Sequence, residues 1–385
     1  MSHFIRLLGE KDKAGSLIAA IVSIRASAPA DTVFELDVNS LRAVPGAPFA
    51  YWVSGEIRGL FARFPKIEND DGRKAVSTNP LNADFRFVRL WFEVGGGRGT
   101  LWRPWAKGGS FSRFYYDIDT VIWWDDDKRT YFGFVGTENR PLERPASVQH
   151  FSRPGLTWPR RRDGLSVRVL PEGSVFADKG PAVLVKNDDL GELLAVGALM
   201  NTNTFGYLIA VQLARTELAQ SYEVGIIQQT PVPDPTPDQE ARLASLARRA
   251  WSIKRGLDTV TETSHAFTLP ALLAVPGHAG GAVMAALDGR EAGLAFLPGL
   301  DLAGRAVAWN AHLARGAAAL ALLQAEIDDL AFALYGIGAE DRAAILAFDA
   351  RRPQAGAAAP DQEAGDDADD EDSGDDEGEP AEAPG

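Results

Sequence analysis

Residues 85–92 have the sequence Phe-Arg-Phe-Val-Arg-Leu-Trp-Phe, and residues 120–124 have the sequence Thr-Val-Ile-Trp-Trp. Both stretches are rich in aromatic and β-branched residues, and turns that contain Gly and Asp lie between such stretches, as in β-strands joined by turns. Residues 85–134 include 15 aromatic residues in 50 positions, whereas aromatic residues make up 9% of the whole chain. The pattern predicts a mostly β module over residues 51–233.

Helices are expected on either side of these strands. Leu190–Asn201 and Phe205–Gln220 are apolar enough to pack on a sheet, so the module is predicted to be α+β. Residues 1–50 are interpreted as a connector that contains a helix near Leu17–Ser27 and a strand at Val33–Leu36. The chain has 385 residues, which is enough for two or three folding units.

A proline-rich joint, Pro231–Pro237, is predicted to end the β module as a stiff spacer. Beyond it, two apolar series with alternating spacings of three and four residues predict an antiparallel helical hairpin over residues 234–340. Gly336 is expected to cap the second helix. The alternative is that these helices simply close the core of a bundle. The first series is Leu243, Leu246, Ala250, Ile253, Leu257 and Val260, and the second is Leu320, Leu323, Ile327, Leu330, Leu334 and Ile337.

The net charge of −14 is unevenly distributed. Residues 351–385 contain 13 acidic and 2 basic residues, whereas residues 51–185 contain 21 basic and 16 acidic residues. An acidic tail therefore masks a mildly basic module. Residues 341–385 are expected to be disordered because the tail carries almost no large apolar side chain. The tail either serves solubility or mimics DNA and competes for the basic module.

The composition and motifs exclude several classes of enzyme. There is no cysteine, and the five histidines are scattered, so no metal site is expected. A Pro-Pro dipeptide, which the amino-methyltransferase signature requires, does not occur, nor do a P-loop or a serine nucleophile elbow. Glu93–Gly99 resembles a loop that binds S-adenosylmethionine, but strand-like residues follow it directly, so we interpret it as a β-turn. Acidic turns likewise explain Asp117 and Asp119 better than a metal site does.

No catalytic centre and no cofactor site are therefore expected in this chain. The apolar stretch Leu17–Ile24 is too short for a secretory signal, and no window reaches the roughly 18 apolar residues of a membrane span. The sequence thus predicts a cytoplasmic protein without membrane contact.

Basic and aromatic residues in the β module remain as candidates for binding. Lys107 and Arg113 flank a glycine pair within Trp105–Tyr116, and three consecutive arginines follow Pro159. Such groups suit phosphates or guanine edges, although a solvated loop is the alternative for the arginine run, and the tryptophans could equally belong to the core. The predicted DNA-contacting set is Lys107, Arg113, Tyr115, Arg160, Arg161, Arg162, Arg103 and Trp158.

A series of short motifs also occurs in a particular order between residues 45 and 340. They are Tyr51–Ser54, Ile57–Phe61, Trp105–Tyr116, Val121–Trp123, Phe151–Trp158, Ser166–Phe176, Leu199–Thr202, Thr230–Pro233, Asp328–Leu330 and Leu334–Ile337. In this order they resemble the target-recognition region of large adenine-specific DNA methyltransferases, both the BREX/Pgl type (PglX) and the fused type IIG restriction-modification enzymes.

The resemblance implies a recognition domain like that of TaqI or of type I specificity subunits, with paired helices that set its position on double-stranded DNA. It also implies a separate methyltransferase catalytic subunit or domain that supplies S-adenosylmethionine, because the Asn-Pro-Pro-Tyr half of the family lies upstream of these motifs. Two other functions remain open at this point. One is a diverged methyltransferase that holds S-adenosylmethionine in Glu93–Gly99, and the other is a β and coiled-coil adaptor for protein or glycan.

Overall fold

Two four-stranded sheets form the β part of the chain. The computed structural model describes residues 1–70, 72–78, 87–94, 101–124, 147–162, 164–214, 220–274 and 301–350. The first sheet has the order β10-β5-β6-β4, in which β10 and β5 are parallel and the other pairs are antiparallel. Its strands are β4 (Val88–Leu90), β5 (Trp102–Ala106), β6 (Thr120–Trp123) and β10 (Val175–Phe176).

The second sheet has the order β3-β11-β7-β9 and is antiparallel throughout. Its strands are β3 (Lys74–Val76), β7 (Gly155–Thr157), β9 (Arg168–Leu170) and β11 (Ala182–Leu184). The segment after β5 connects the two sheets, because the amide of Phe114 donates to Val167 O at 2.7 Å and the amide of Val169 donates to Phe114 O at 3.3 Å. A third pairing joins β8 (Arg161–Arg162) to β12 (Gln220–Ser221).

Both predicted strands contain β-structure, with one shorter than expected. Thr120–Trp123 is a strand as predicted. In the other stretch the strand ends at Leu90, where the Glu93 carboxylate accepts from the Leu90 amide and starts a 3-10 turn, η2 (Trp91–Glu93). Phe85 and Arg86 lie outside the described residues.

The two helices expected to pack on a sheet are present as α5 (Leu190–Met200) and α6 (Asn203–Leu213). Asp189 caps α5 and Thr202 caps α6, each with a side-chain oxygen that accepts a backbone amide of the first turn. Helix α5 packs against β7 and β9, and Gly197 provides the close approach, because a Cβ there would lie 2.9 Å from Leu156. The α+β class is therefore confirmed.

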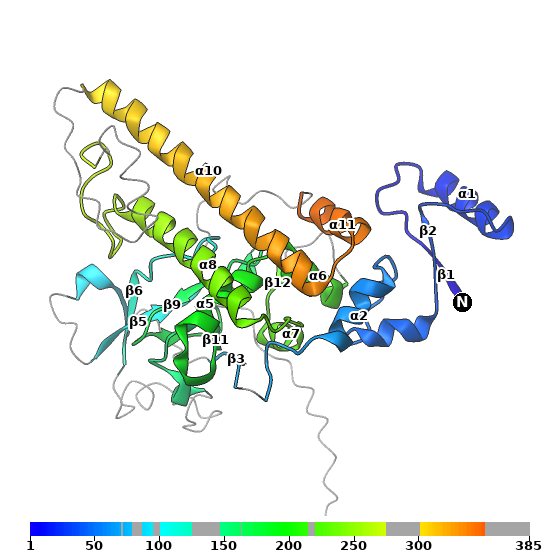
Figure 1. Cartoon of the computed structure of the whole chain (residues 1–385), viewed down its shortest axis with the longest axis horizontal. Coiled ribbons are helices and arrows are strands. Elements are labelled where there is room, and N and C mark those ends of the chain that lie inside the picture. The colour runs from blue at the N-terminus through cyan, green and yellow to red at the C-terminus, as the bar shows by residue number, and fades with distance from the viewer. Residues whose placement is uncertain are drawn as a thin grey trace, which may run out of the picture. The chain divides into compact units, whose positions relative to one another are not determined.

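A long antiparallel helix pair follows the proline-rich segment (Figure 1). Helix α8 (Pro237–Asp258) starts at a capping box formed by Thr236 and Gln239, and α10 (Leu302–Tyr335) ends at Gly336 with φ +67°. Arg242 near the start of α8 pairs with Glu326, and Leu257 at its end contacts Gly316, so the two helices run in opposite directions. Gly336 thus caps the helix as predicted.

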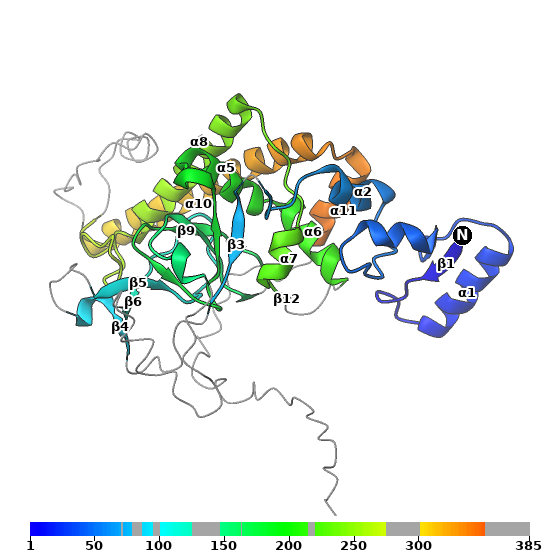
Figure 2. The same ribbon diagram turned by 90° about the horizontal axis from the view of Figure 1, so that it is seen from below.

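The helix pair and the β module share one hydrophobic core. Helix α8 packs on α5 as well as on α10, and α5 lies between α8 and the second sheet (Figure 2). The Tyr335 hydroxyl donates to Pro231 O at 2.8 Å, and Val232 is also buried. The first half of the proline segment, Pro231–Pro233, is therefore a buried crossing rather than an open spacer, which the sequence did not indicate, whereas Asp234, Thr236 and Pro237 are exposed.

Two further groups of elements complete the described chain. At the N-terminus, β1 (Ser2–Ile5) pairs with β2 (Val33–Leu36) around α1 (Lys13–Arg25). Helix α11 (Ala339–Ala350) packs on α6 through the buried Ile345. The prediction that disorder begins at residue 341 is therefore wrong for residues 341–350, which are helical. Residues 351–385 lie outside the described part of the chain. The remaining elements are η1 (Val38–Ala43), α2 (Gly55–Arg63), η3 (Val148–His150), η4 (Lys186–Asp188) and α7 (Val224–Gln229).

Among the described residues, no single helix has both the length and the apolar character to cross a membrane. Helices α5 and α6 pass that test only as a pair, with a bend of 63° between them.

Candidate nucleic-acid interface

Arginine side chains hold the glycine-containing loop after β5 in one conformation through hydrogen bonds to its carbonyls. Gly108 and Gly109 both have φ +103°, a backbone conformation that other residues rarely adopt. The Arg168 guanidinium donates to the carbonyls of Gly108 and Ser110, the latter at 3.0 Å, and the Arg162 Nε donates to Gly109 O at 3.0 Å. Three consecutive carbonyls of the loop are thus occupied by arginines.

Arg168 is a residue that the sequence analysis missed. It is only 3% exposed, its guanidinium lies 4.4 Å from the centroid of the Tyr116 ring, and burial lowers its pKa to about 10. The signal in the sequence was the alternation of β9, which places Arg168 on the same face as the buried Leu170. An arginine on a core face needs partners there, and the loop carbonyls supply them.

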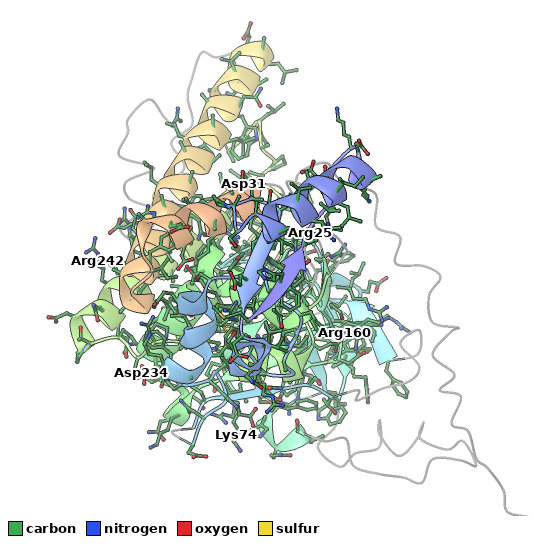
Figure 3. All side chains as sticks on the ribbon, turned by 90° about the vertical axis from the view of Figure 1, so that its right-hand side faces the viewer. Arg25, Asp31, Lys74, Arg160, Asp234 and Arg242 are labelled. Carbon is green, nitrogen blue, oxygen red and sulfur yellow. The ribbon has the colours of Figure 1, made fainter. Side chains whose placement is uncertain are left out.

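The three consecutive arginines do not form one exposed cluster. Arg160, which is labelled in Figure 3, has guanidinium nitrogens 3.3 Å from an oxygen of Asp178 and 3.7 Å from an oxygen of Glu223. Arg162 points to the loop, and Arg161 is the exposed member of the run. Strand pairing in β8 explains the difference, because neighbouring residues of a strand face opposite sides. The expectation of three guanidiniums on a surface turn is therefore corrected to one.

Three other predicted cations lie at or near the loop, each only partly exposed. The Lys107 ammonium lies 5.0 Å from the centroid of the Trp105 ring, and the Arg113 guanidinium lies 5.9 Å from that of Phe111. Arg103, on β5, donates to the Ser152 hydroxyl at 2.6 Å. Lys107, Arg113 and Arg161 therefore remain as candidates for contact with phosphate, and Arg103 is directed at the protein.

Trp158 belongs to the core and not to a surface. Its side chain is 0% exposed, and its Nε1 donates to Tyr222 O at 2.8 Å. A base cannot stack on a ring that is enclosed on both faces, so Trp158 is removed from the predicted DNA-contacting set. The aromatic residues of this module thus include both core members and partly exposed ones such as Tyr115.

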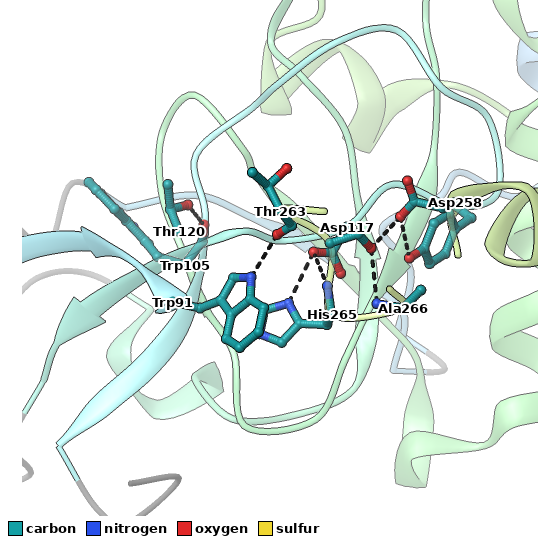
Figure 4. A network of polar contacts seen from close by, with 10 residues as sticks. Trp91, Trp105, Asp117, Thr120, Asp258, Thr263, His265 and Ala266 are labelled. Atoms are coloured by element: carbon teal, nitrogen blue, oxygen red, sulfur yellow. Dashed lines mark hydrogen bonds and ion pairs between the residues drawn. The ribbon is translucent and has the colours of Figure 1, made fainter. Parts of the chain in front are cut away.

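Tyr115 belongs to a polar network at the end of α8, in which Figure 4 labels Asp117, Asp258 and His265. Its hydroxyl donates to the Asp258 carboxylate at 2.9 Å, and burial raises its pKa. Nearby, Asp117 accepts from the backbone amide of His265 at 3.0 Å, and the His265 ring stacks on Trp91 at 4.3 Å. These contacts attach the segment after α8 to the β module.

A cavity of about 350 Å³ lies beside this network. Carboxylates, hydroxyls and one amine line it, among them Ser112, Tyr116, Asp117, Asp119, Lys254 and Asp258. In the ranges that the structure describes, no group of three or more His, Cys, Asp or Glu side chains is arranged to hold a metal ion.

The suspected cofactor loop Glu93–Gly99 is described only at its start. Glu93 accepts from the Leu90 amide at 2.8 Å, and Gly95–Gly99 lie outside the described ranges.

The pH dependence of stability tests whether Lys254 is buried at the contact between α8 and the β module. Its ammonium donates to the Ser112 hydroxyl at 2.7 Å, and burial, followed by Arg113 and Arg168, lowers its pKa from 10.5 to about 8. Between these two values the unfolded state binds more protons than the folded state, so the free energy of unfolding increases as pH rises. We expect this increase to amount to about 2–3 kcal/mol relative to Lys254→Met, which lacks the group.

The measurement is urea unfolding of both proteins from pH 7 to about pH 10.5, with Ser112→Ala as the control that removes only the hydrogen bond. Equal pH profiles for the wild type and Lys254→Met would show that Lys254 keeps its ordinary pKa in the fold.

Comparison with known proteins relates the chain to a class of enzymes. No family model matches it. It is 26% identical over 249 residues to the adenine-specific methyltransferase BrxX of Escherichia coli O9:H4 (strain HS), a match that covers 62% of this chain and 19% of that protein. It is also 26% identical over 187 residues to the adenine-specific methyltransferase PglX of Lacticaseibacillus casei (strain Zhang), covering 45% of this chain and 15% of that protein.

The chain is distantly related to adenine-specific methyltransferases of the BREX/Pgl type. The resemblance read from the ordered motifs is confirmed to that extent. The matched segments span less than a fifth of the length of these relatives.

Proposed function

We propose that this chain is the DNA target-recognition part of an adenine-N6 DNA methyltransferase in a phage-defence (BREX) or restriction-modification system. The observation that carries the proposal is the relationship over 249 residues to an adenine-specific methyltransferase. The matched segment amounts to 19% of that protein, which leaves ample room for a catalytic part elsewhere in the relative.

The glycine loop supports a role in binding. Its fixed backbone is bordered by Lys107 and Arg113, and phosphate contacts of this kind orient a protein on the duplex. Base edges then supply the sequence information. In this proposal the β module reads DNA in the manner of TaqI or of a type I specificity subunit, and the helix pair α8 and α10 fixes its position.

Catalysis is assigned to a separate methyltransferase domain or subunit that binds S-adenosylmethionine. That partner would receive the target adenine after it is turned out of the duplex, because the exocyclic amine is not accessible to an enzyme inside the stack. The contribution of this chain is to choose the site.

Selection from a pool of random duplex DNA tests the proposal directly. The purified chain, alone and with the neighbouring methyltransferase subunit, is incubated with the pool at moderate salt, and bound sequences are counted. We expect one enriched motif that contains adenine. Calorimetric titration with S-adenosylmethionine is run in parallel, and we expect no binding to this chain. Absence of enrichment under both conditions, with the protein folded, would overturn the proposal in favour of an adaptor.

A further inference from the structure

The carbonyls and the amides of the glycine loop have different surroundings. The carbonyls of Gly108, Gly109 and Ser110 accept from Arg168 and Arg162, as described above. The amides of Gly109 and Ser110 donate to no acceptor in the described part of the chain. Ser110 is exposed and Gly108 and Gly109 are partly exposed, while the carbonyls of all three residues are occupied.

Each arginine contact also changes the charge at the loop. A carbonyl oxygen repels an approaching anion, and pairing it with a guanidinium removes this repulsion. Successive backbone amides in a turn can form a concave donor site that binds anions, as in many phosphate sites. Gly108 and Gly109 both have φ +103°, so the chain turns here in a conformation that residues with a side chain rarely adopt.

Close packing by neighbouring residues restricts rotation of the peptide groups in the loop Gly108–Ser110. A Cβ at Gly109 would lie 2.8 Å from the Tyr116 ring, and a Cβ at Gly180 would lie 2.5 Å from Ala106 O. The Arg168 guanidinium packs on the same Tyr116 ring at 4.4 Å. The loop is therefore enclosed between Tyr116, Gly180 and the two arginines, with its tip at Ser110.

We propose that Arg168 is a positioning residue which, with Arg162, holds the loop Gly108–Ser110 so that its backbone amides bind one phosphate of the DNA backbone. Arg168 itself is buried and does not touch the phosphate. The inference rests on the proposed function, because it names the element of this chain that binds the backbone of the duplex.

The test follows Gly109 while DNA binds. The full chain is labelled with ¹⁵N at glycine, and its amide spectrum is recorded during titration with a short duplex of random sequence at low salt, where binding depends on phosphates. Triple-resonance spectra of the deuterated chain labelled with ¹³C and ¹⁵N assign the resonance without a substitution in the loop. Fluorescence anisotropy gives the affinity and its salt dependence for the wild type, Arg168→Met, Arg168→Lys and the control Arg25→Met, which removes an exposed arginine at the end of α1.

We expect the Gly109 amide to shift with the same midpoint as the anisotropy. Arg168→Met should lower affinity roughly tenfold and make the salt slope less negative by about 0.9, the value for one phosphate. Arg168→Lys should be nearly as weak, because one ammonium lacks the planar fork that reaches two carbonyls. Arg25→Met should bind as the wild type does.

The outcomes separate this inference from the proposed function. Binding of DNA without a shift of Gly109 would overturn the loop contact and leave the proposed function intact. No binding of DNA by the wild type would overturn the proposed function itself. Where Arg168→Met fails to fold, Arg162→Met, which removes the donor to Gly109 O, replaces it, and an unchanged salt slope in that variant counts against the inference.

Discussion

Replacing Trp158 with alanine lowers the free energy of unfolding by about 3–5 kcal/mol, the usual cost of removing a large aromatic side chain from a core. The indole is 0% exposed and packs within the core that the second sheet shares with α5 and α8. The substitution also leaves Tyr222 O, which accepts from Nε1 at 2.8 Å, without its donor. Urea unfolding followed by fluorescence measures the change.

Two control variants separate the causes. Trp158→Phe keeps most of the ring volume and loses the hydrogen bond, so we expect it to cost less than half as much as alanine. Trp309→Ala removes a partly exposed indole on α10 and should change stability by less than about 1 kcal/mol. A loss at Trp158 no greater than that at Trp309 would be inconsistent with a core position.

Reversing the charge of Lys107 and Arg161 together is expected to weaken DNA binding about a hundredfold at moderate salt. Arg161 is the exposed member of its run, and Lys107 borders the glycine loop. Each lost phosphate contact weakens binding roughly tenfold and makes the salt slope less negative by about one. The measurement is anisotropy with Lys107→Glu plus Arg161→Glu over roughly 50–200 mM salt.

The matched control for this prediction carries the same change of net charge elsewhere. Arg242 on α8 and Arg342 on α11 form exposed ion pairs with Glu326 and Asp329. Arg242→Glu plus Arg342→Glu should lower affinity only by the general effect of charge, which is screened over about 10 Å. Equal losses in the two double variants would show that the binding face lies elsewhere.

Local signals predicted the helices well. Gly336 ends α10 with a left-handed conformation that glycine adopts readily, as the sequence predicted, whereas the capping box of Thr236 and Gln239 that starts α8 was not part of the prediction. The apolar spacing also placed Leu243, Leu246 and Ala250 on the buried face. Such signals depend only on residues a few positions apart, which a sequence displays directly.

The binding loop shows the limit of the same reasoning. The residues Lys107 and Arg113 could be proposed from composition, but the role of Arg168 could not, because its acceptors at Gly108 and Ser110 are about 60 positions away. The arginine run was misjudged for a related reason. Whether Arg160 faces carboxylates depends on Asp178 and Glu223, which the fold brings together from different segments.

The buried part of the proline segment has a consequence for exchanging the β module between related proteins. A chimera designed from composition alone would be joined within Pro231–Pro237, so that the β module of a relative is fused to the helix pair of this chain. That cut would separate Tyr335 from Pro231 O and α8 from α5, and each half of the chimera would carry an open apolar surface. The β module, α8, α10 and α11 should therefore be exchanged together as one block that ends after α11.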